Sequence, residues 1–399
     1  MPRAPLSVAL MLLLAAQPVA TDLYLPALPH IAASLGKGAG QVQATLTVFI
    51  LAFGIAQLAA GPLVDHYGRR RVLLWGLALY VLAALAGTLA TALPQLLAAR
   101  AVQGVATAAA VIAARAIIRD QHAGPAGMRI MARSLTGQSA IGVACPLAGG
   151  VAAQYLGWQA TLAMVAGFGV LAWLAVYTGY RETWRRPESP ARAGLWTFLS
   201  HPQFVACALL AGLSFSGALC FLILSPFVFI GEFGMSRMAY GALPALCSLA
   251  FLLGTVLCGR LLRHWSVPGV VRLGACLSLL GGGGQVLLWH GGVHTVWALV
   301  IPQCVYMLGH GFHNPCGQAG AVAPFPAHAG RAAAVSGFVL TGTGFVSGQL
   351  ATASGAAASD TLVAAMGCIT ALLAVVALVC VPFACRERAL PGHAANRNL

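Results

Sequence analysis

The sequence predicts an all-α polytopic membrane protein with twelve transmembrane helices in two pseudo-symmetric six-helix bundles. Three observations lead to this fold class. Only 8% of the 399 residues are charged, and the mean hydropathy is +0.85, whereas soluble proteins carry about 25% charged residues. Apolar runs of about 20 residues, the length of a membrane-crossing helix, recur along the chain. One long polar segment divides these runs six and six.

The predicted spans are twelve, and an even number leaves both termini on one side of the membrane. They cover approximately residues 5–29, 41–62, 72–93, 96–118, 130–155, 158–180, 201–226, 238–259, 268–289, 294–316, 331–354 and 360–382.

The distribution of basic residues orients these spans. Of the 22 Lys and Arg residues, only Lys37 and Arg237 fall on the side opposite the termini, and Arg100 lies inside a span. Because cytoplasmic loops carry the excess of Lys and Arg, both termini are expected in the cytoplasm. The net charge of +14 then reflects topology, and no nucleic-acid partner is expected.

The first predicted span contains a carboxylate, Asp22. An Asp at the centre of a membrane helix costs about 2.5–3.5 kcal/mol, so such residues usually face a cavity and serve a pathway or a proton relay. Pro26 and Pro29 cannot continue a regular helix, and we expect them to break the span near its outer end. Alternatively, residues 1–20 form a cleaved secretory signal peptide, with Arg3 before an apolar stretch.

Span four contains Arg100, a permanently charged group that needs an anionic or water-lined partner. Counted from Pro94 and Pro29 at 1.5 Å per residue, Arg100 and Asp22 both lie about 9–10 Å from the outer ends of their helices. They can therefore lie at one level, and we expect them to form a proton-coupling pair. Alternatively, Arg100 extends outward to the lipid headgroups.

Several other predicted spans carry polar side chains. In span two, Gln43 and its polar neighbours suit either a water-lined face or helix–helix hydrogen bonds. In span ten, His310, His313 and Cys316 follow one another at three-residue spacing. A metal site would need a fourth ligand, so no metal or cofactor is expected. The open alternatives for these histidines are a protonatable or substrate-contacting group and plain polar packing.

Residues 61–71 read GPLVDHYGRRR and predict a short cytoplasmic loop. This stretch resembles the signature G-x-L-x-D-R-x-G-R-R of the major facilitator superfamily, with His66 in place of an arginine. The resemblance implies the fold of that superfamily and a loop that latches the cytoplasmic side during alternating access. The implied gating loop comprises Gly61, Asp65, Gly68, Arg69 and Arg70.

Two further motifs resemble those of proton-coupled drug exporters. R-x-x-Q-G, starting at Arg100, resembles a fourth-helix motif in which the arginine is tied to proton transfer. The stretch around residues 145–150 resembles the antiporter motif G-x-x-x-G-P-x-x-G-G, with Ile141 and Cys145 in place of two glycines. The resemblance implies export, through the motif residues Pro146, Gly149 and Gly150.

The polar segment 181–200 is expected to be a cytoplasmic linker between six-helix bundles at 1–180 and 201–385, with a cytoplasmic tail at 386–399. Pro26 and Pro226 lie 200 residues apart, which indicates a weak internal repeat. Parallel repeats relate the halves of facilitators, with the substrate site at their interface. Asp22 is not repeated, because Leu222 occupies the position 200 further on.

The stretch 21–29, TDLYLPALP, resembles the D-x-Y-L-P-A-x-P start of the Bcr/CflA branch, relatives of the CmlA chloramphenicol exporters, and residues 323–334 resemble a loop of that branch. The resemblance implies a proton-coupled exporter of small, partly apolar drugs, chloramphenicol- or bicyclomycin-like, in the cell inner membrane, and we expect a monomer. The alternatives are a proton-coupled uptake permease and a membrane-embedded enzyme or scaffold; the spans offer no paired carboxylates for an enzyme. The expected substrate cavity comprises Thr21, Tyr24, Gln43, Gln103, Ser214, Ser216, His310 and Asn314.

Overall fold

The computed structural model describes residues 4–121, 124–182, 194–325, 328–352 and 358–385, and within these ranges it contains helices and no β-strand. The first half comprises α1 (Ala4–Asp22), η1 (Leu25–Ala27), α2 (Leu28–Leu35), α3 (Ala39–Tyr67), α4 (Arg69–Thr88), α5 (Leu93–Gln121), α6 (Gly124–Tyr155) and α7 (Trp158–Gly179). The second half comprises α8 (Leu195–Leu199), α9 (Pro202–Pro226), the π-helix η2 (Phe227–Glu232), α10 (Arg237–Leu261), α11 (Val267–His290), α12 (Val296–Val322), α13 (Ala329–Thr352) and α14 (Ala358–Cys385).

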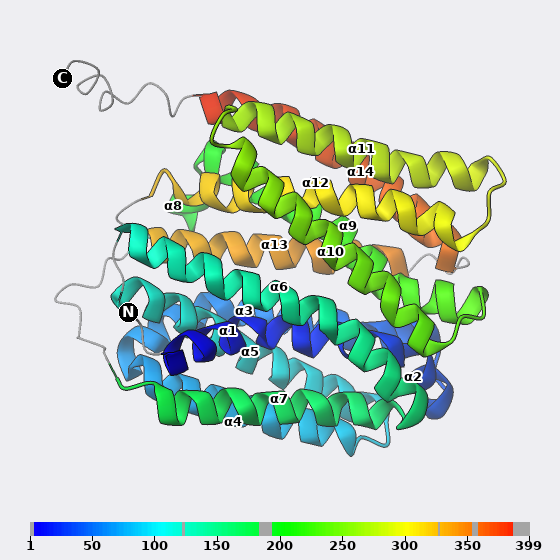
Figure 1. The fold of residues 1–399 in the computed structure, drawn as a ribbon, viewed down its shortest axis with the longest axis horizontal. Helices are drawn as coiled ribbons and strands as arrows, with labels where there is room; N and C mark the ends of the chain where they lie inside the picture. Colours follow the sequence, from blue (N-terminus) through cyan, green and yellow to red (C-terminus); the bar gives the residue numbers. More distant parts are fainter. Residues whose placement is uncertain (1–3, 122–123, 183–193, 326–327, 353–357, 386–399) are drawn as a thin grey trace.

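The two halves repeat one another in their packing (Figure 1). Helix α5 packs against α3 and α4, as α12 packs against α10 and α11. Helix α1 packs against α5, α6 and α7, as α9 packs against α12, α13 and α14. These matched contacts form two pseudo-symmetric six-helix bundles, which confirms the predicted fold class.

The bundles meet along two helix pairs related by the same pseudo-symmetry, α3 with α13 and α6 with α10. Where α6 ends and α10 begins, the contact is tight. A Cβ atom on Gly150 would lie 2.7 Å from the carbonyl oxygen of Arg237, and Arg237 Nη1 donates to Ala153 O over 3.2 Å. This contact lies at the end of the molecule opposite the start of α1 (Figure 1).

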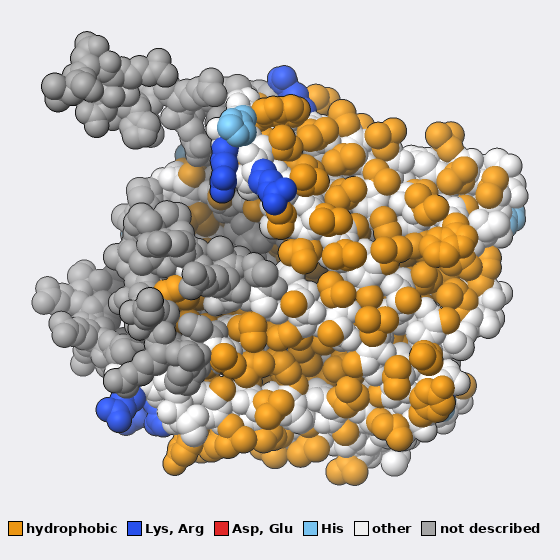
Figure 2. All heavy atoms as spheres, in the orientation of Figure 1, with side chains coloured by type: hydrophobic (Ala, Val, Ile, Leu, Met, Phe, Trp, Pro, Cys, Tyr) orange, Lys and Arg blue, Asp and Glu red, His pale blue; other side chains and the backbone are white. Residues whose placement is uncertain are grey.

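The outer surface is suited to lipid. Among the described residues, nine helical segments are long and apolar enough to cross a membrane. Hydrophobic side chains cover the lateral face in Figure 2, and the basic side chains on this face gather near the end where α1 starts. Trp75, Leu89 and Leu287 are 78%, 79% and 76% exposed. Exposed apolar surface on this scale is typical of a membrane contact.

The prolines of the first span break it, as predicted. Helix α1 ends at Asp22, and the 3₁₀ turn η1 precedes α2. Pro26 has no N–H to donate to the carbonyl of Asp22 four residues earlier, and the chain turns instead through a 3.3 Å bond from Tyr24 N–H to Thr21 O. In the second half, α9 ends at Pro226 and continues as η2, so the internal repeat includes this break.

The predicted loop at residues 61–71 is wrong, because α3 continues to Tyr67 and α4 follows directly. Gly61 and Asp65 therefore lie within α3, although the side chain of Asp65 is outside the described part of the structure. A helix can carry a proline such as the one after Gly61 at the cost of one hydrogen bond and a bend. Only Gly68 separates the two helices, and its φ of +88° and ψ of +153° favour glycine.

The start of α1 and the end of α14 lie at the same end of the molecule, near α8 (Figure 1). Residues 183–193 of the predicted linker and the predicted tail 386–399 lie outside the described residues. The domain boundaries at 180, 200 and 385 therefore stay predictions.

Candidate functional site

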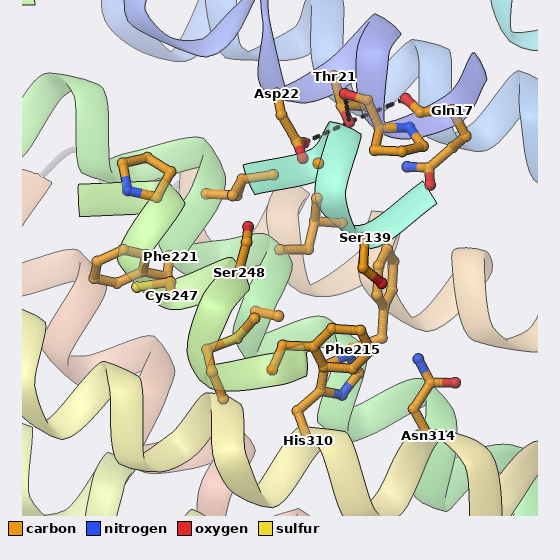
Figure 3. Close-up of a pocket in the computed structure, with 18 of the residues that line it drawn as sticks. Gln17, Thr21, Asp22, Ser139, Phe215, Phe221, Cys247, Ser248, His310 and Asn314 are labelled. Atoms are coloured by element: carbon orange, nitrogen blue, oxygen red, sulfur yellow. Dashed lines mark hydrogen bonds between the residues drawn. The ribbon is translucent and has the colours of Figure 1, made fainter. Parts of the chain in front are cut away.

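A cavity of about 240 Å³ lies between the two bundles. Helices α1, α3 and α6 line it from the first half, and α9, α10 and α12 line it from the second (Figure 3). The wall is largely aliphatic and aromatic with a few polar groups, a composition typical of small-molecule sites. The polar lining residues are Gln17, Thr21, Asp22, Gln138, Ser139, Ser248, Gln303, His310 and Asn314.

Asp22 is the last residue of α1 and lies on the cavity wall formed by the first half (Figure 3). The Thr21 hydroxyl donates to Asp22 Oδ1 over 2.7 Å. Asp22 Oδ2 has no hydrogen-bond partner in the described part of the chain, and the side chain is half-buried. One carboxylate oxygen is thus held by the protein, while the other is open to the cavity. Leu222, the equivalent of Asp22 in the repeat, also lines the cavity, so the two-fold relation leaves a carboxylate on one side alone.

The second-half wall presents a histidine, an amide and aromatic rings. His310 Nδ1 lies 2.9 Å from Ser214 Oγ, and the His310 ring lies 4.9 Å from the Phe251 ring, centre to centre. Asn314 follows one turn later on α12, and Gln318 Nε2 donates to Asn314 Oδ1. Figure 3 shows His310 and Asn314 across the cavity from Asp22.

Arg100 lies behind the cavity wall that contains Asp22. The residue is 1% exposed, and its guanidinium carbon lies 4.6 Å from the Tyr24 ring centre and 4.5 Å from the Phe49 ring centre. Its Nη1 donates to Gln103 Oε1, while Nε and Nη2 have no partner among the described residues. Cations between aromatic faces are stabilised by the ring quadrupoles. Arg100 is therefore at the level of the α1 break. No ion pair joins it to Asp22 among the described residues, and the proton-coupling pair stays a prediction.

The predicted cavity residues fall into three groups. Thr21, His310 and Asn314 line the cavity, and Ser214 contacts His310 from behind. The others are buried in helix contacts: Tyr24 hydrogen-bonds Thr45, Gln43 donates to Ile223 O, Gln103 accepts from Arg100, and Ser216 donates to Gly212 O.

Several lining residues were not among the sequence predictions, including Gln17, Ser139, Phe215 and Ser248. Helical periodicity could have found some of them, because residues three, four or seven apart share a helix face. Gln17 lies one turn before Thr21, and Met307 one turn before His310.

The three possible metal ligands of span ten diverge. His313 Nε2 contacts Val271 O of α11 at 3.3 Å, and Cys316 Sγ lies 3.8 Å from Cys258 Sγ of α10. His310 instead faces α9 through Ser214. Within the described residues, no three His, Cys, Asp or Glu side chains form a group that could hold a metal ion.

The start of α4 is tied to the end of α7 through Arg70. Its Nε donates to Tyr180 O over 3.0 Å and its Nη2 to Tyr177 O over 3.1 Å. Its backbone N–H donates to Glu182 Oε2 over 2.8 Å, where a carboxylate is favoured by the helix N-terminus. Arg69 turns back and donates to Val64 O of α3. Arg69 and Arg70 thus brace α3, α4 and α7 within the first bundle.

The predicted antiporter residues pack α6 closely against its neighbours. A Cβ atom on Gly149 would overlap the carbonyl oxygen of Leu23, directly after Asp22. A Cβ atom on Gly241 of α10 would lie 2.5 Å from Pro146 O. Glycine at these positions allows the backbones of α6, α10 and the α1 break to touch.

Comparisons with known proteins identify the family. Residues 10–348 match the family model described as Major Facilitator Superfamily. A chloramphenicol resistance protein of Pseudomonas aeruginosa is 31% identical over 285 residues, and the match covers 70% of this chain and 65% of that relative's length. Multidrug resistance protein D of Escherichia coli K12 is 30% identical over 346 residues, covering 82% of this chain and 83% of that protein.

A solved structure of a D-xylose–proton symporter has a TM-score of 0.76 at 14% identity and covers 92% of this chain and 96% of that one. This likeness supports the fold. The family model and the two relatives confirm the resemblance found in the sequence, including its drug-resistance branch. The chain belongs to the major facilitator superfamily and is a membrane transporter, not an enzyme.

Proposed function

We propose that this transporter exports small, partly apolar drugs in exchange for protons. The observation that carries the proposal is the Asp22 carboxylate on the wall of a mostly apolar cavity between the two bundles. The names of the relatives, which refer to chloramphenicol and multidrug resistance, support a drug substrate.

Asp22 is the natural proton carrier because of where the other acids lie. The chain has eight Asp and Glu residues, and the other seven lie near helix ends or between helices in the sequence. Asp360 and Glu232, for example, sit at the start of α14 and the end of η2. A carboxylate at a water-filled cavity inside the membrane is a recurrent proton relay.

In the proposed cycle, a proton and a drug occupy the cavity in alternation. Asp22 Oδ2 takes up a proton when the cavity opens outward, and Thr21 holds Oδ1 so that the carboxyl keeps its orientation. A nearby guanidinium favours the ionised carboxylate, so a change in the distance between Asp22 and Arg100 would change the proton affinity of Asp22. Proton binding can then bias the two states of the transporter, because each state binds the proton differently.

The proposed movement is a rocking of the two bundles about the cavity. Opening outward would separate the end of α6 from the start of α10, where Arg237 contacts Ala153. We place the shared end of α1 and α14 in the cytoplasm on the strength of the basic residues, in the bacterial inner membrane, with the protein acting as a monomer.

The test is drug resistance in a host that lacks its own exporters. The wild type should raise the tolerated chloramphenicol concentration, and Asp22→Asn should return it to that of the empty host. Asp360→Asn is the matched control, because Asp360 lies at the start of α14 and does not line the cavity. Asp360 accepts from Trp289 Nε1 of α11, and an Asn can still accept there.

Inverted membrane vesicles test direction and coupling. With an inwardly acidic proton gradient, wild-type vesicles should accumulate labelled drug, and added drug should drive protons out. Full drug-linked proton movement in Asp22→Asn would overturn the proton-coupling proposal. Accumulation by right-side-out vesicles instead would show uptake.

A further inference from the structure

His310 lies on the second-half wall, and its ring is held among aromatic side chains (Figure 3). The ring lies at 28° to the Phe251 ring, with centres 4.9 Å apart, and 6.4 Å from the Phe215 ring. This packing fixes the plane of the imidazole. The hydrogen bonds of the two ring nitrogens then decide what His310 offers to a ligand.

Ser214 determines which nitrogen carries the proton. Ser214 Oγ donates to Ala211 O over 3.1 Å, the usual bond of a helical serine to the preceding turn. The same Oγ lies 2.9 Å from His310 Nδ1. A hydroxyl has one hydrogen, so with that hydrogen on Ala211 O, Nδ1–H is the donor to Ser214 Oγ.

The other nitrogen, Nε2, is therefore a bare acceptor when the ring is neutral. It makes no hydrogen bond within the described part of the chain, yet it is not sealed off from the cavity that His310 lines. A charged His310 ring, which has no carboxylate partner among the described residues, would be costly to bury. The neutral ring, with Nε2 facing the cavity, is the form that this environment favours.

Asn314 complements this acceptor one turn later on α12. Gln318 donates to Asn314 Oδ1, which leaves the Asn314 amide N–H groups for the cavity. The wall thus offers an acceptor and a donor on one helix face, four residues apart, beside the Phe215 and Phe251 rings.

Building on the proposed drug export, we propose that His310 determines specificity by accepting, at Nε2, a hydrogen bond from a hydroxyl or amide N–H of the substrate. Ser214 is the positioning residue that fixes the required tautomer. The substrate class is then a small molecule with an aromatic or apolar body and a hydroxyl or amide donor beside it.

Binding of radiolabelled chloramphenicol, which carries hydroxyl and amide donors, to the purified full-length protein tests this assignment. His310→Phe keeps a ring and removes the acceptor, and it should weaken binding about tenfold, equivalent to about 1.4 kcal/mol. His310→Gln places an acceptor near the Nε2 position and should restore binding to within about threefold of the wild type. The affinity of Ser214→Ala for chloramphenicol should lie between those of His310→Phe and His310→Gln.

His313→Phe is the matched control, because His313 is a buried histidine on the same helix that contacts α11 and not the cavity. Its chloramphenicol binding should equal that of the wild type. Binding by His310→Phe within twofold of the wild type would overturn the assignment. Equal weakening in His310→Phe and His310→Gln would also overturn it, because a role in ring packing alone predicts that result.

The tautomer can be read without any drug. In nitrogen-15 spectra of histidine-labelled protein, assigned with His310→Gln, the His310 signal should show a protonated Nδ1 and an unprotonated Nε2. A protonated Nε2 would overturn the inference even if the protein exports drugs. Failure of the wild type to export or bind chloramphenicol would instead count against the proposed function, and this spectrum would still decide the His310 assignment.

Discussion

The guanidinium carbon of Arg100 lies 4.6 Å from the centre of the Tyr24 ring, in the segment where α1 breaks after Asp22. The Phe49 ring of α3 covers the same group at 4.5 Å. Arg100 is thus attached to the break in α1 and not to the Asp22 carboxylate itself. A movement of the break would shift Asp22 relative to Arg100, which gives the proposed exporter a physical link between proton binding and helix position.

Replacing Arg100 by Lys is expected to abolish drug export although the positive charge is kept. A lysine ammonium is compact and lacks the planar group that stacks between two rings while donating to Gln103, and a desolvated cation–π contact contributes about 2 kcal/mol. Chloramphenicol tolerance in the exporter-deficient host should fall to that of the empty host. Tyr24→Phe, which keeps the ring and loses only its contact with Thr45, should keep most of the export. Equal loss in both variants would show that the stacked arrangement is not what matters.

The helical architecture was predictable because a helix that crosses the bilayer needs about 20 mostly apolar residues, and such runs are visible in the sequence. Each predicted span coincides with a long helix or, for the first span, a broken one. The position of the break was predictable too, since Pro26 removes a donor wherever the chain is placed. The end of α3 was not, because Gly61 and its proline suggest a turn, while the helix tolerates both and ends only where Gly68 needs a positive φ.

The cavity was predictable only in part. Asp22, His310 and Asn314 stand out because polar groups inside a membrane are costly and usually have a function. Phe215 and its aromatic neighbours do not stand out, because an apolar side chain in a membrane helix looks the same whether it faces lipid, core or ligand. Tyr24 was expected in the cavity and instead covers Arg100, and this contact across helices leaves no trace in local spacing.

Replacing Gly149 by Ala should destabilise the protein, because the new Cβ atom would overlap the Leu23 carbonyl. Overpacking of this kind costs about 1–3 kcal/mol, and it would also displace the residue next to Asp22. Both the thermal unfolding midpoint in detergent and the drug resistance should fall. Gly167→Ala on α7 is the matched control, since its Cβ position faces open space, with no side chain or neighbouring helix of the described structure within 4 Å. An unchanged midpoint in Gly149→Ala would contradict the close packing of α6 on the α1 break.

Replacing Gly68 by Ala should also destabilise the protein, for a different reason. Its φ of +88° and ψ of +153° are essentially restricted to glycine and cost other residues about 1–3 kcal/mol. The new Cβ atom would also lie 2.8 Å from Glu182 Oε2, which holds the backbone N–H of Arg70. The unfolding midpoint should fall, whereas Gly61→Ala, inside α3 with open space around it, should leave it unchanged or raise it slightly. A larger fall in the midpoint for Gly61→Ala than for Gly68→Ala would favour a loop at residue 61 over the helix.

Replacing Arg237 by Ala should favour the state that is open at the end opposite the termini. Arg237 Nη1 donates to Ala153 O over 3.2 Å, and its backbone N–H donates to Gln154 Oε1 over 3.3 Å. A cation at the C-terminus of a helix such as α6 contributes about 0.3–1 kcal/mol. Losing it would shift a two-state equilibrium about two- to fivefold toward the open form.

The shift can be measured as the distance between spin labels at Leu89 and Trp297, two exposed residues at this end of the first and second bundles. Because the chain has eleven cysteines, the labels are best introduced as noncanonical residues. The population with the longer distance should grow in Arg237→Ala. It should stay the same in Arg260→Ala, which removes an exposed charge from the other end of α10. An identical response of the two variants would mean that net charge, and not the contact with α6, holds this end closed.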